Sequence, residues 1–431
     1  MGIFLAILAL SFLIIIHELG HFLVAKAFKV RVNEFSLFMG PKLFSFQKGE
    51  TVYSLRLIPL GGYVKMEGEE EVSEDDRAFN KKPIGARAAI IAAGPIMNIV
   101  IAVVFAFIIH ANTGYYTTQI KEVMPDSAGE KAGLQAGDIL QKYNNKTILN
   151  VNDLELFAYP LTDQSIDLQY VRNGEVKTVH FAPKREGGYM LGFTPKDQAV
   201  DGANSNVVAG IQDKSPAMEA GLENGDRIVK LNGTGIKTRQ DIANVLDQIK
   251  ANKVTITVER DGKTVDLNQV VPMVRKNPEY YAMGIADFQH VKGGIGGTLK
   301  EAVKYNVFIA RSIYYSLGWL FTGTIPPSEL SGPVGITTTI KDVVEQSPTV
   351  MDTVINLLSI TTMISINLGL VNLIPFPALD GSKLILLLVE GIRKKPLNPE
   401  KEAMITMIGM VILIMLMLYA TFNDILRIGR G

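Results

Sequence analysis

The stretch Ser11–Phe22, with the sequence SFLIIIHELGHF, places three ionisable side chains inside a run of apolar residues. The residues before the first of these side chains, from Gly2 to Ile16, carry no charge. Apolar residues continue after the last of them as far as Ala25. A helix of about 20 apolar residues crosses the hydrocarbon core of a bilayer. Ionisable groups are costly there and are candidate functional residues by default. The stretch therefore predicts a membrane-spanning helix that carries a site.

Three further stretches, Ala88–Ile109, Thr353–Leu379 and Ala403–Phe422, are free of charge and long enough to span a bilayer. The first stretch lacks the basic start and the small-residue cleavage site of a signal peptide, so we expect it to be retained. The fold class is therefore an α-helical membrane protein with four spans. We place them at residues 1–28, 88–112, 351–382 and 403–424.

Basic residues decide the expected orientation of these spans. They are frequent between the first two spans, in residues 29–87, and between the last two, in residues 383–402. Loops rich in Lys and Arg stay in the cytoplasm. Both termini, including the tail 425–431, and the long segment between the second and third spans should then face the extracytoplasmic side.

Composition excludes several functions. The 431 residues hold 43 Lys plus Arg against 43 Asp plus Glu, so no net charge favours nucleic acid as a partner. There is no cysteine, which excludes disulfides, thiol nucleophiles and zinc sites with cysteine ligands.

The outer segment contains an internal repeat. Residues 125–140 read PDSAGEKAGLQAGDIL and residues 215–229 read SPAMEAGLENGDRIV, and each is followed by alternating strands with a tight turn. The shared pattern resembles bacterial PDZ domains, which implies two α/β modules, expected at 113–195 and 196–290. Such grooves bind extended peptide ends by strand addition. The alternative is a repeat that serves only as a spacer or lid.

Two short stretches, Leu191–Phe193 and Met283–Ile285, resemble the glycine loop that PDZ domains place near a peptide carboxylate. Their order leaves open which module holds each loop. Residues 291–350 follow with an amphipathic helical pattern that carries charges such as Lys304 and Arg311, so no span is expected there. Such a helix suits the outer membrane surface, and the alternative is packing on the PDZ pair.

His17-Glu18-Leu-Gly-His21 is an H-E-x-x-H motif. Residues four apart on a helix differ by about 40° around the axis and roughly 6 Å along it, so both imidazoles can converge on one ion. Glu18 beside them is placed to take a proton from a water molecule at that ion. The motif predicts Zn²⁺ as the cofactor. The alternative is a pair of hydrogen-bonded polar residues near a helix end.

Catalytic zinc takes three protein ligands and keeps one position open. The other three histidines, His110, His180 and His290, are expected on the outer side, whereas the motif lies toward the cytoplasmic end of its span. Asp380 closes the third charge-free run at a comparable depth, after the proline-broken segment Asn372–Pro377. Topology therefore nominates Asp380 as the third ligand. The alternative is an Asp-Gly turn at a membrane exit.

Together, the H-E-x-x-H span, the Leu-Asp-Gly after a proline-broken span and the PDZ pair between them resemble the site-2 protease family of intramembrane metalloproteases, over essentially the whole chain. The resemblance implies His17, His21 and Asp380 as zinc ligands and Glu18 as general base. It also implies that Asn98, in a Gly-Pro-x-x-Asn motif, and Asn372, Pro375 and Pro377 shape the site and hold substrate. Phe35–Met66 is similar to the family's membrane-associated β region.

The same resemblance implies hydrolysis of single-pass transmembrane proteins within the bilayer. Pre-trimmed anti-sigma factors, as in regulated intramembrane proteolysis during stress responses, and signal-peptide remnants are the implied substrates, and the bacterial inner membrane is the implied location. The PDZ pair is expected to act as a size filter. Two alternatives remain on the residues alone: a non-catalytic PDZ membrane scaffold, which would not need Glu18, and a metal-ion transporter, which would need further polar spans.

Overall fold

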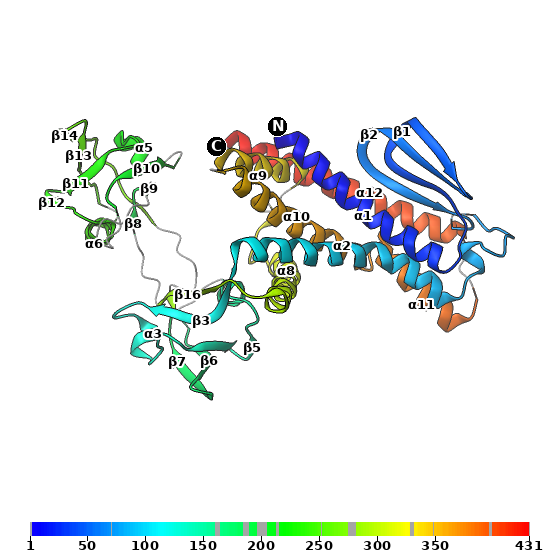
Figure 1. Cartoon of the computed structure of the whole chain (residues 1–431), viewed down its shortest axis with the longest axis horizontal. Coiled ribbons are helices and arrows are strands. Elements are labelled where there is room, and N and C mark those ends of the chain that lie inside the picture. Colours follow the sequence, from blue (N-terminus) through cyan, green and yellow to red (C-terminus); the bar gives the residue numbers. More distant parts are fainter. Residues whose placement is uncertain are drawn as a thin grey trace. The chain divides into compact units, whose positions relative to one another are not determined.

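The computed structural model describes residues 2–69, 71–159, 164–183, 189–195, 205–212, 215–250, 252–274, 282–327, 332–347, 349–395 and 399–430. The chain forms two compact units. One consists of Met1–Thr118, Leu149–Leu156 and Gln289–Gly431, and the other of Gln119–Ile148 and Phe157–Phe288. Figure 1 shows the helices and strands of both units.

In the described part of the chain, four helices are long and apolar enough to cross a membrane, at the positions expected from the sequence. The third ends earlier than expected, at Leu373 instead of residue 382, because Pro375 and Pro377 lack the N–H groups that a continuing helix needs. A separate helix, α11 (Asp380–Arg393), then begins. The four spanning helices are α1 (Gly2–Ala27), α2 (Ile84–Thr113), α10 (Val350–Leu373) and α12 (Pro399–Arg430).

Helix α2 packs between α1 and α10, and small residues allow the close approach (Figure 1). A Cβ added to Gly20 of α1 would lie 2.8 Å from the carbonyl carbon of Ala93. A Cβ added to Gly369 of α10 would lie 2.8 Å from the carbonyl oxygen of Pro95. The backbones of the three helices are therefore nearly in contact at one level, and that level holds the H-E-x-x-H motif.

The predicted β region is a two-stranded antiparallel hairpin of β1 (Val32–Lys48) and β2 (Thr51–Met66). The Ser11 hydroxyl donates to the carbonyl of Pro59, so β2 runs beside α1. Within the hairpin, burial alone would raise the pKa of Glu34, but hydrogen bonds from Ser54 and Arg56 lower it to about 2. This carboxylate therefore stays charged and joins the two strands.

Two helices follow the two α/β modules in the sequence and precede the third span: α8 (Ile295–Thr322) and α9 (Pro333–Gln346). We call these modules the outer modules after the side of the membrane that the sequence leads us to expect. As expected, α8 is not among the helices apolar enough to span. Its Ile309 is buried with Ala102 of α2 and Ile366 of α10. Packing against two spanning helices was part of neither expectation for this segment.

The first outer module is a sheet with strand order β16-β3-β4-β6-β7, and β5 pairs with β4. The strands are β3 (Tyr115–Val123), β4 (Ile139–Tyr143), β5 (Lys146–Thr147), β6 (Ile166–Arg172), β7 (Glu175–Phe181) and β16 (Ile285–Val291), with the helices α3 (Ala128–Lys131) and α4 (Asn152–Ala158).

The second outer module has the sheet order β12-β11-β13-β14 and two smaller pairs, β10-β9 and β15-β8, around one buried apolar cluster. Its strands are β8 (Tyr189–Met190), β9 (Phe193–Pro195), β10 (Val208–Ile211), β11 (Arg227–Leu231), β12 (Thr234–Gly235), β13 (Ile256–Arg260), β14 (Lys263–Asp266) and β15 (Met273–Val274), with the helices α5 (Pro216–Ala220) and α6 (Arg239–Ile249).

In the sequence, the second module is inserted between β7 and β16 of the first module. This insertion corrects the expected boundaries. Residues 189–195 were assigned to the first module but pair within the second, whereas β16 was assigned to the second and pairs with β3. The glycine loops follow the same rule. Gly192 lies against Ser215, which caps α5, and Gly284 lies against Ser127, which caps α3. Sequence order hid this arrangement because the pairing of β3 with β16 joins strands far apart in the chain.

Both modules hold the Asp of their Gly-Asp motif in the same way. Arg172 Nε donates to Asp138 Oδ1 at 2.6 Å, and Arg260 Nε donates to Asp226 Oδ1 at 2.8 Å. Each arginine also donates through Nη2 to the second carboxylate oxygen, at 2.7 Å in both modules. Bidentate pairs of this kind are among the strongest charge-assisted contacts. The motif aspartates are therefore structural groups.

Candidate metal centre

Two imidazoles of α1 converge at the level where α1, α2 and α10 meet. His17 and His21 are one helical turn apart, and their Nε2 atoms lie 3.1 Å from each other. His17 is 8% exposed. Glu18 lies between them in sequence, with its Cγ 3.8 Å from where a Cβ at Gly62 of β2 would be. The β hairpin therefore borders the carboxylate of the motif.

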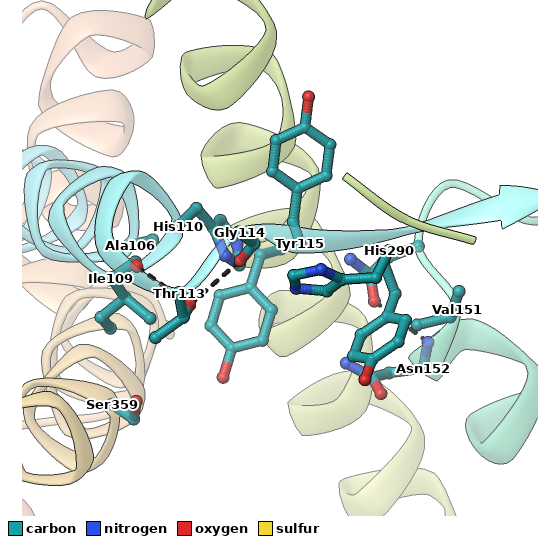
Figure 2. Close-up of a pocket in the computed structure, with 13 residues that line it drawn as sticks. Ala106, Ile109, His110, Thr113, Gly114, Tyr115, Val151, Asn152, His290 and Ser359 are labelled. Carbon is teal, nitrogen blue, oxygen red and sulfur yellow. Dashed lines mark hydrogen bonds between the residues drawn. The ribbon is translucent and has the colours of Figure 1, made fainter. Parts of the chain in front are cut away.

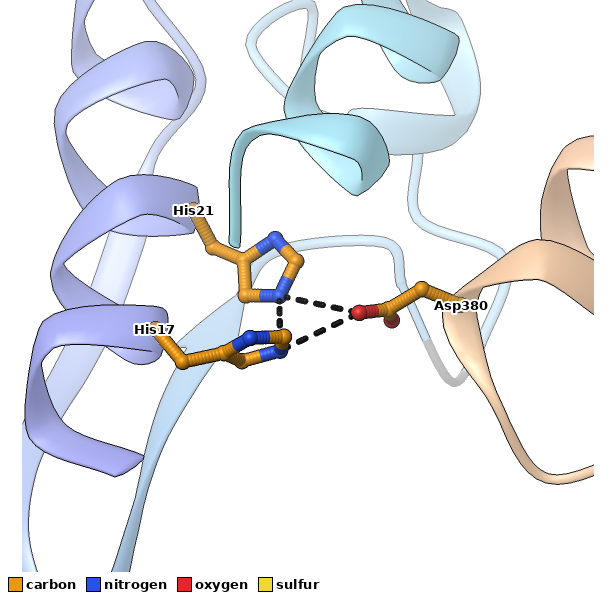
Figure 3. Close-up of side chains that lie close together, drawn as sticks. All are labelled: His17, His21 and Asp380. Carbon is orange, nitrogen blue, oxygen red and sulfur yellow. Dashed lines mark hydrogen bonds and ion pairs between the residues drawn. The ribbon is translucent and has the colours of Figure 1, made fainter. Parts of the chain in front are cut away.

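Asp380 reaches the same point from the other end of the chain (Figure 3). It is the first residue of α11, after the connection that contains Pro375 and Pro377. Its Oδ2 lies 3.1 Å from His17 Nε2 and 3.6 Å from His21 Nε2. The break in the helix after Leu373 thus turns this carboxylate toward both rings.

Helix α2 orients both rings from behind. The carbonyl oxygen of Ile90 lies 2.8 Å from His21 Nδ1, and Asn98 Nδ2 lies 3.2 Å from His17 Nδ1. A Cβ at Gly94 would overlap the Nε2 of His21 and lie 2.8 Å from that of His17. Each ring is therefore held through Nδ1, and each Nε2 points to the shared space that Gly94 leaves open.

The donor set fits a divalent transition metal. One ligand atom from each of His17, His21 and Asp380 lies within 4.8 Å of the others. Two imidazole nitrogens and one carboxylate oxygen are a common ligand set of catalytic zinc, and the position left over accepts water or substrate. The second partners at Nδ1 are the contacts that metal-bound histidines ordinarily have.

Two ion pairs attach α11 to its surroundings. Lys383 Nζ lies 3.1 Å from Glu69 Oε1, in the acidic loop after the hairpin. Arg87 near the start of α2 makes a bidentate contact with Glu390, at 2.5 and 3.1 Å. The helix that begins with Asp380 is therefore fixed on two sides, which limits how far its carboxylate can move.

Comparison with known proteins places this geometry in a family. The model of the family described as Peptidase family M50 matches residues 5–416. The chain belongs to peptidase family M50. It is 32% identical to the zinc metalloprotease RasP of Bacillus licheniformis, and the match covers 98% of each chain. It is 31% identical to the regulator of sigma-W protease RasP of Bacillus subtilis over 96% of each chain, and 30% identical to the probable protease eep of Enterococcus faecalis over 98% of each.

Membership of family M50 confirms the predicted likeness to site-2 proteases and the predicted enzyme class, a metallopeptidase with membrane-spanning helices. Because the family is one of peptidases, the alternative of a non-catalytic PDZ membrane scaffold is excluded. The three nominated side chains do lie together in this M50 peptidase, and their role as ligands remains a prediction.

The other predicted site residues of the M50 peptidase fall into two groups. Asn372, Pro375 and Pro377 lie at the end of α10 and in the connection to Asp380, half-buried or exposed. Asn98 is different, because it is 0% exposed and contacts His17. The Gly-Pro-x-x-Asn motif was expected to shape the site and hold substrate; the structure adds the contact of Asn98 with His17 and the space that Gly94 leaves for both rings. The spacing of four residues between them could have shown that both share one face of α2.

Helix α12 contributes a further close contact. A Cβ at Gly409 would overlap the carbonyl group of Pro377. The fourth span therefore lies directly against the connection that positions Asp380, although none of its described residues belongs to the His17, His21 and Asp380 cluster.

A separate hollow of about 440 Å³ lies at the other end of α2 (Figure 2). His110, Tyr115, His290 and Tyr305 are among its lining residues. None of the lining residues belongs to the metal centre, so the two histidines there are distant from the chemistry of the peptidase, as the sequence predicted for His110 and His290.

Proposed function

We propose that this M50 peptidase is a zinc-dependent intramembrane endopeptidase that hydrolyses single-pass transmembrane proteins. One observation carries the proposal: the Nε2 atoms of His17 and His21 and the Oδ2 of Asp380 converge within 3.6 Å between helices long enough to span a bilayer. The relatives named zinc metalloproteases support Zn²⁺ as the metal.

The three converging side chains would hold the zinc ion. When bound, zinc supplies a Lewis acid that polarises the scissile carbonyl and lowers the pKa of a water molecule at the site. Glu18 takes the proton of the attacking water and delivers it to the leaving amine. The site would lie toward the cytoplasmic side, so water would reach it from there.

A substrate helix hides its carbonyl groups in hydrogen bonds, so the scissile segment must be extended when it reaches the site. Asn372 offers an amide that can pair with an extended backbone, and Pro375 and Pro377 keep the connection beside it free of helix. We propose that these three residues contact the substrate.

The substrates we propose are anti-sigma-factor-like proteins already trimmed outside the membrane, together with signal-peptide remnants. The relative from Bacillus subtilis is named as the regulator of sigma-W protease. The protein would lie in the bacterial inner membrane, with both termini and the two outer modules on the extracytoplasmic side. The modules would be PDZ domains that bind peptide ends and act as a size filter.

The direct test is Glu18→Gln in the purified full chain, with a tethered single-pass substrate in lipid or detergent. Cleavage should fall by about 10²- to 10⁴-fold while bound zinc stays at one equivalent, because the base is lost and the three ligands remain. Glu71→Gln, the same change in the exposed acidic loop, is the control and should cleave normally. Full cleavage by Glu18→Gln would contradict the proposal.

The nested topology gives a cleaner test of the size filter than deletion of the whole outer segment. Replacement of residues 189–274 by a flexible linker removes the second module alone, since β16 stays with the first sheet. Untrimmed substrate should then be cleaved at a rate approaching that of trimmed substrate. If discrimination persists both here and after removal of residues 115–290, the modules are not the filter.

A further inference from the structure

We infer that Asn98 is a positioning residue that holds the His17 ring in the tautomer whose Nε2 is free to bind the metal. The inference rests on the proposed metal site and goes beyond it, since it replaces substrate contact as the function of Asn98. It starts from burial: the Asn98 side chain is 0% exposed, so it offers no surface to a substrate.

The second ring nitrogen of His17 needs a hydrogen-bond partner, and the Asn98 amide is in place to be that partner. Its Nε2 is the atom that converges with His21 and Asp380. A neutral imidazole that gives the Nε2 lone pair to a metal carries its proton on Nδ1, and that N–H needs an acceptor. The group facing Nδ1 at 3.2 Å is the side-chain amide of Asn98.

The proton that metal binding leaves on His17 Nδ1 favours one orientation of that amide. As placed, Nδ2 faces the ring, and Oδ1 is buried with no hydrogen-bond partner among the described residues. The oxygen and nitrogen of an amide are assigned from their partners, since they differ little in shape. A 180° flip turns Oδ1 toward the Nδ1–H of His17. This rotation gives a partner to the ring proton and to Oδ1, and it moves Nδ2 into the buried position that Oδ1 leaves.

The backbone around Asn98 is fixed independently of the amide. Ser365 Oγ of α10 donates to the Asn98 carbonyl oxygen at 2.7 Å. His21 has the equivalent acceptor in the Ile90 carbonyl, a main-chain atom that substitution leaves in place. Helix α2 thus provides one acceptor for each ring, and only the acceptor for His17 is a side chain that can be replaced.

The test measures zinc affinity of the full chain by competition with a chelator. In Asn98→Leu, the His17 Nδ1–H loses its acceptor, and affinity should fall by about 10- to 100-fold. Asn98→Asp restores an acceptor of the same shape and should return affinity to within a few-fold of the wild type. Co²⁺ in place of Zn²⁺ should show an altered visible spectrum in the Leu variant and a near-normal one in the Asp variant.

Thr362→Val is the matched control. Thr362 is also 0% exposed in a span, but its hydroxyl donates to the Leu358 carbonyl of its own helix and has no other hydrogen bond among the described residues. Its affinity for zinc should equal that of the wild type. Asn98→Ala, which cannot overpack, carries the same expectation as Asn98→Leu if the larger side chain prevents folding.

Three results would overturn the inference: wild-type affinity in the Leu and Ala variants, affinity in Asn98→Asp as low as in Asn98→Leu, or an equal loss in Thr362→Val. Failure of the metal site itself gives a different result. If His17→Ala kept zinc at wild-type affinity, the proposed ligand set would be wrong whatever the Asn98 variants did.

Discussion

The outer modules and the metal centre each hold a carboxylate of a sequence motif, buried in the modules and half-buried at Asp380. The two kinds of site differ in the groups that face this carboxylate. Asp138 and Asp226 each meet a guanidinium 34 residues further along the chain. Asp380 meets two imidazoles from the opposite end of the chain, at 3.1 and 3.6 Å. A guanidinium keeps its charge and satisfies both carboxylate oxygens, whereas neutral imidazoles leave lone pairs directed at one point.

The difference separates a motif that stabilises the fold from one whose geometry suits a metal ion. In the modules, the fold supplies the cation itself, so nothing further is needed at the aspartate. At the metal centre, two nitrogens and one oxygen converge with no guanidinium among them, and a bound cation would complete the arrangement. Removal of a carboxylate should therefore have opposite consequences in the two regions.

The largest expected effect is in Asp380→Ala. Loss of one of the three proposed ligands should weaken zinc binding by more than about 100-fold, above the loss typical of a residue that only supports a ligand. The outer modules should unfold as in the wild type. Asp342→Ala, at an exposed site on α9, is the control. Unchanged zinc affinity in Asp380→Ala, measured by chelator competition, would contradict a role for Asp380 in metal binding.

Gly94→Ala tests the space between the rings. A Cβ there overlaps His21 Nε2, so the two nitrogens must separate, and zinc affinity should fall by about 10- to 100-fold. The control is Gly318→Ala, a helical glycine of α8 with no atom within 4 Å of an added Cβ. That change should stabilise the helix by up to about 1 kcal/mol and leave zinc binding unaltered. Normal affinity in Gly94→Ala would mean that the rings are less constrained than the distances indicate.

Arg260→Leu applies the same logic to the second module. Asp226, with a side chain 1% exposed, would lose its partner, which should cost about 3 kcal/mol of that module's stability. Zinc binding should be unchanged. Arg227→Leu, at an exposed arginine 3.9 Å from Glu259, should cost less than about 1 kcal/mol. Urea unfolding followed by hydrogen exchange in β11 and β13 distinguishes the two variants, and equal losses would contradict a special role for Arg260.

The smallest effect is expected from acid. Burial alone would raise the pKa of Asp226, but hydrogen bonds from Arg260 and the Glu223 N–H lower it below its usual value. Its contribution to stability is therefore complete above the unfolded aspartate pKa of about 3.9 and is lost as pH falls through the lowered folded value. Hydrogen exchange in β11 should show this loss, and Asp226→Asn should flatten it. An unaltered acid profile in Asp226→Asn would assign the loss to other groups.

The sequence predicted the parts of this fold that depend on local pattern. The four spans follow from charge-free runs, and the placement of His17 and His21 on one face follows from helical spacing. The absence of cysteine and the positions of the other histidines left a carboxylate as the third ligand. The expected depth in the membrane then nominated Asp380. The features that were missed involve contacts between distant segments: the pairing of β3 with β16, the packing of α8 on α2, and the contact between Asn98 and His17.

The nesting of one module inside the other has a consequence for biosynthesis. β3 ends at Val123, but its outer neighbour β16 begins only at Ile285, about 160 residues later. At about 5–20 residues per second, β3 waits roughly 8–30 s with one edge unpaired, while the whole second module emerges and can fold. An open strand edge is a template for unwanted pairing. Each newly made chain therefore passes through an interval in which the second module is complete and the first module still lacks β16.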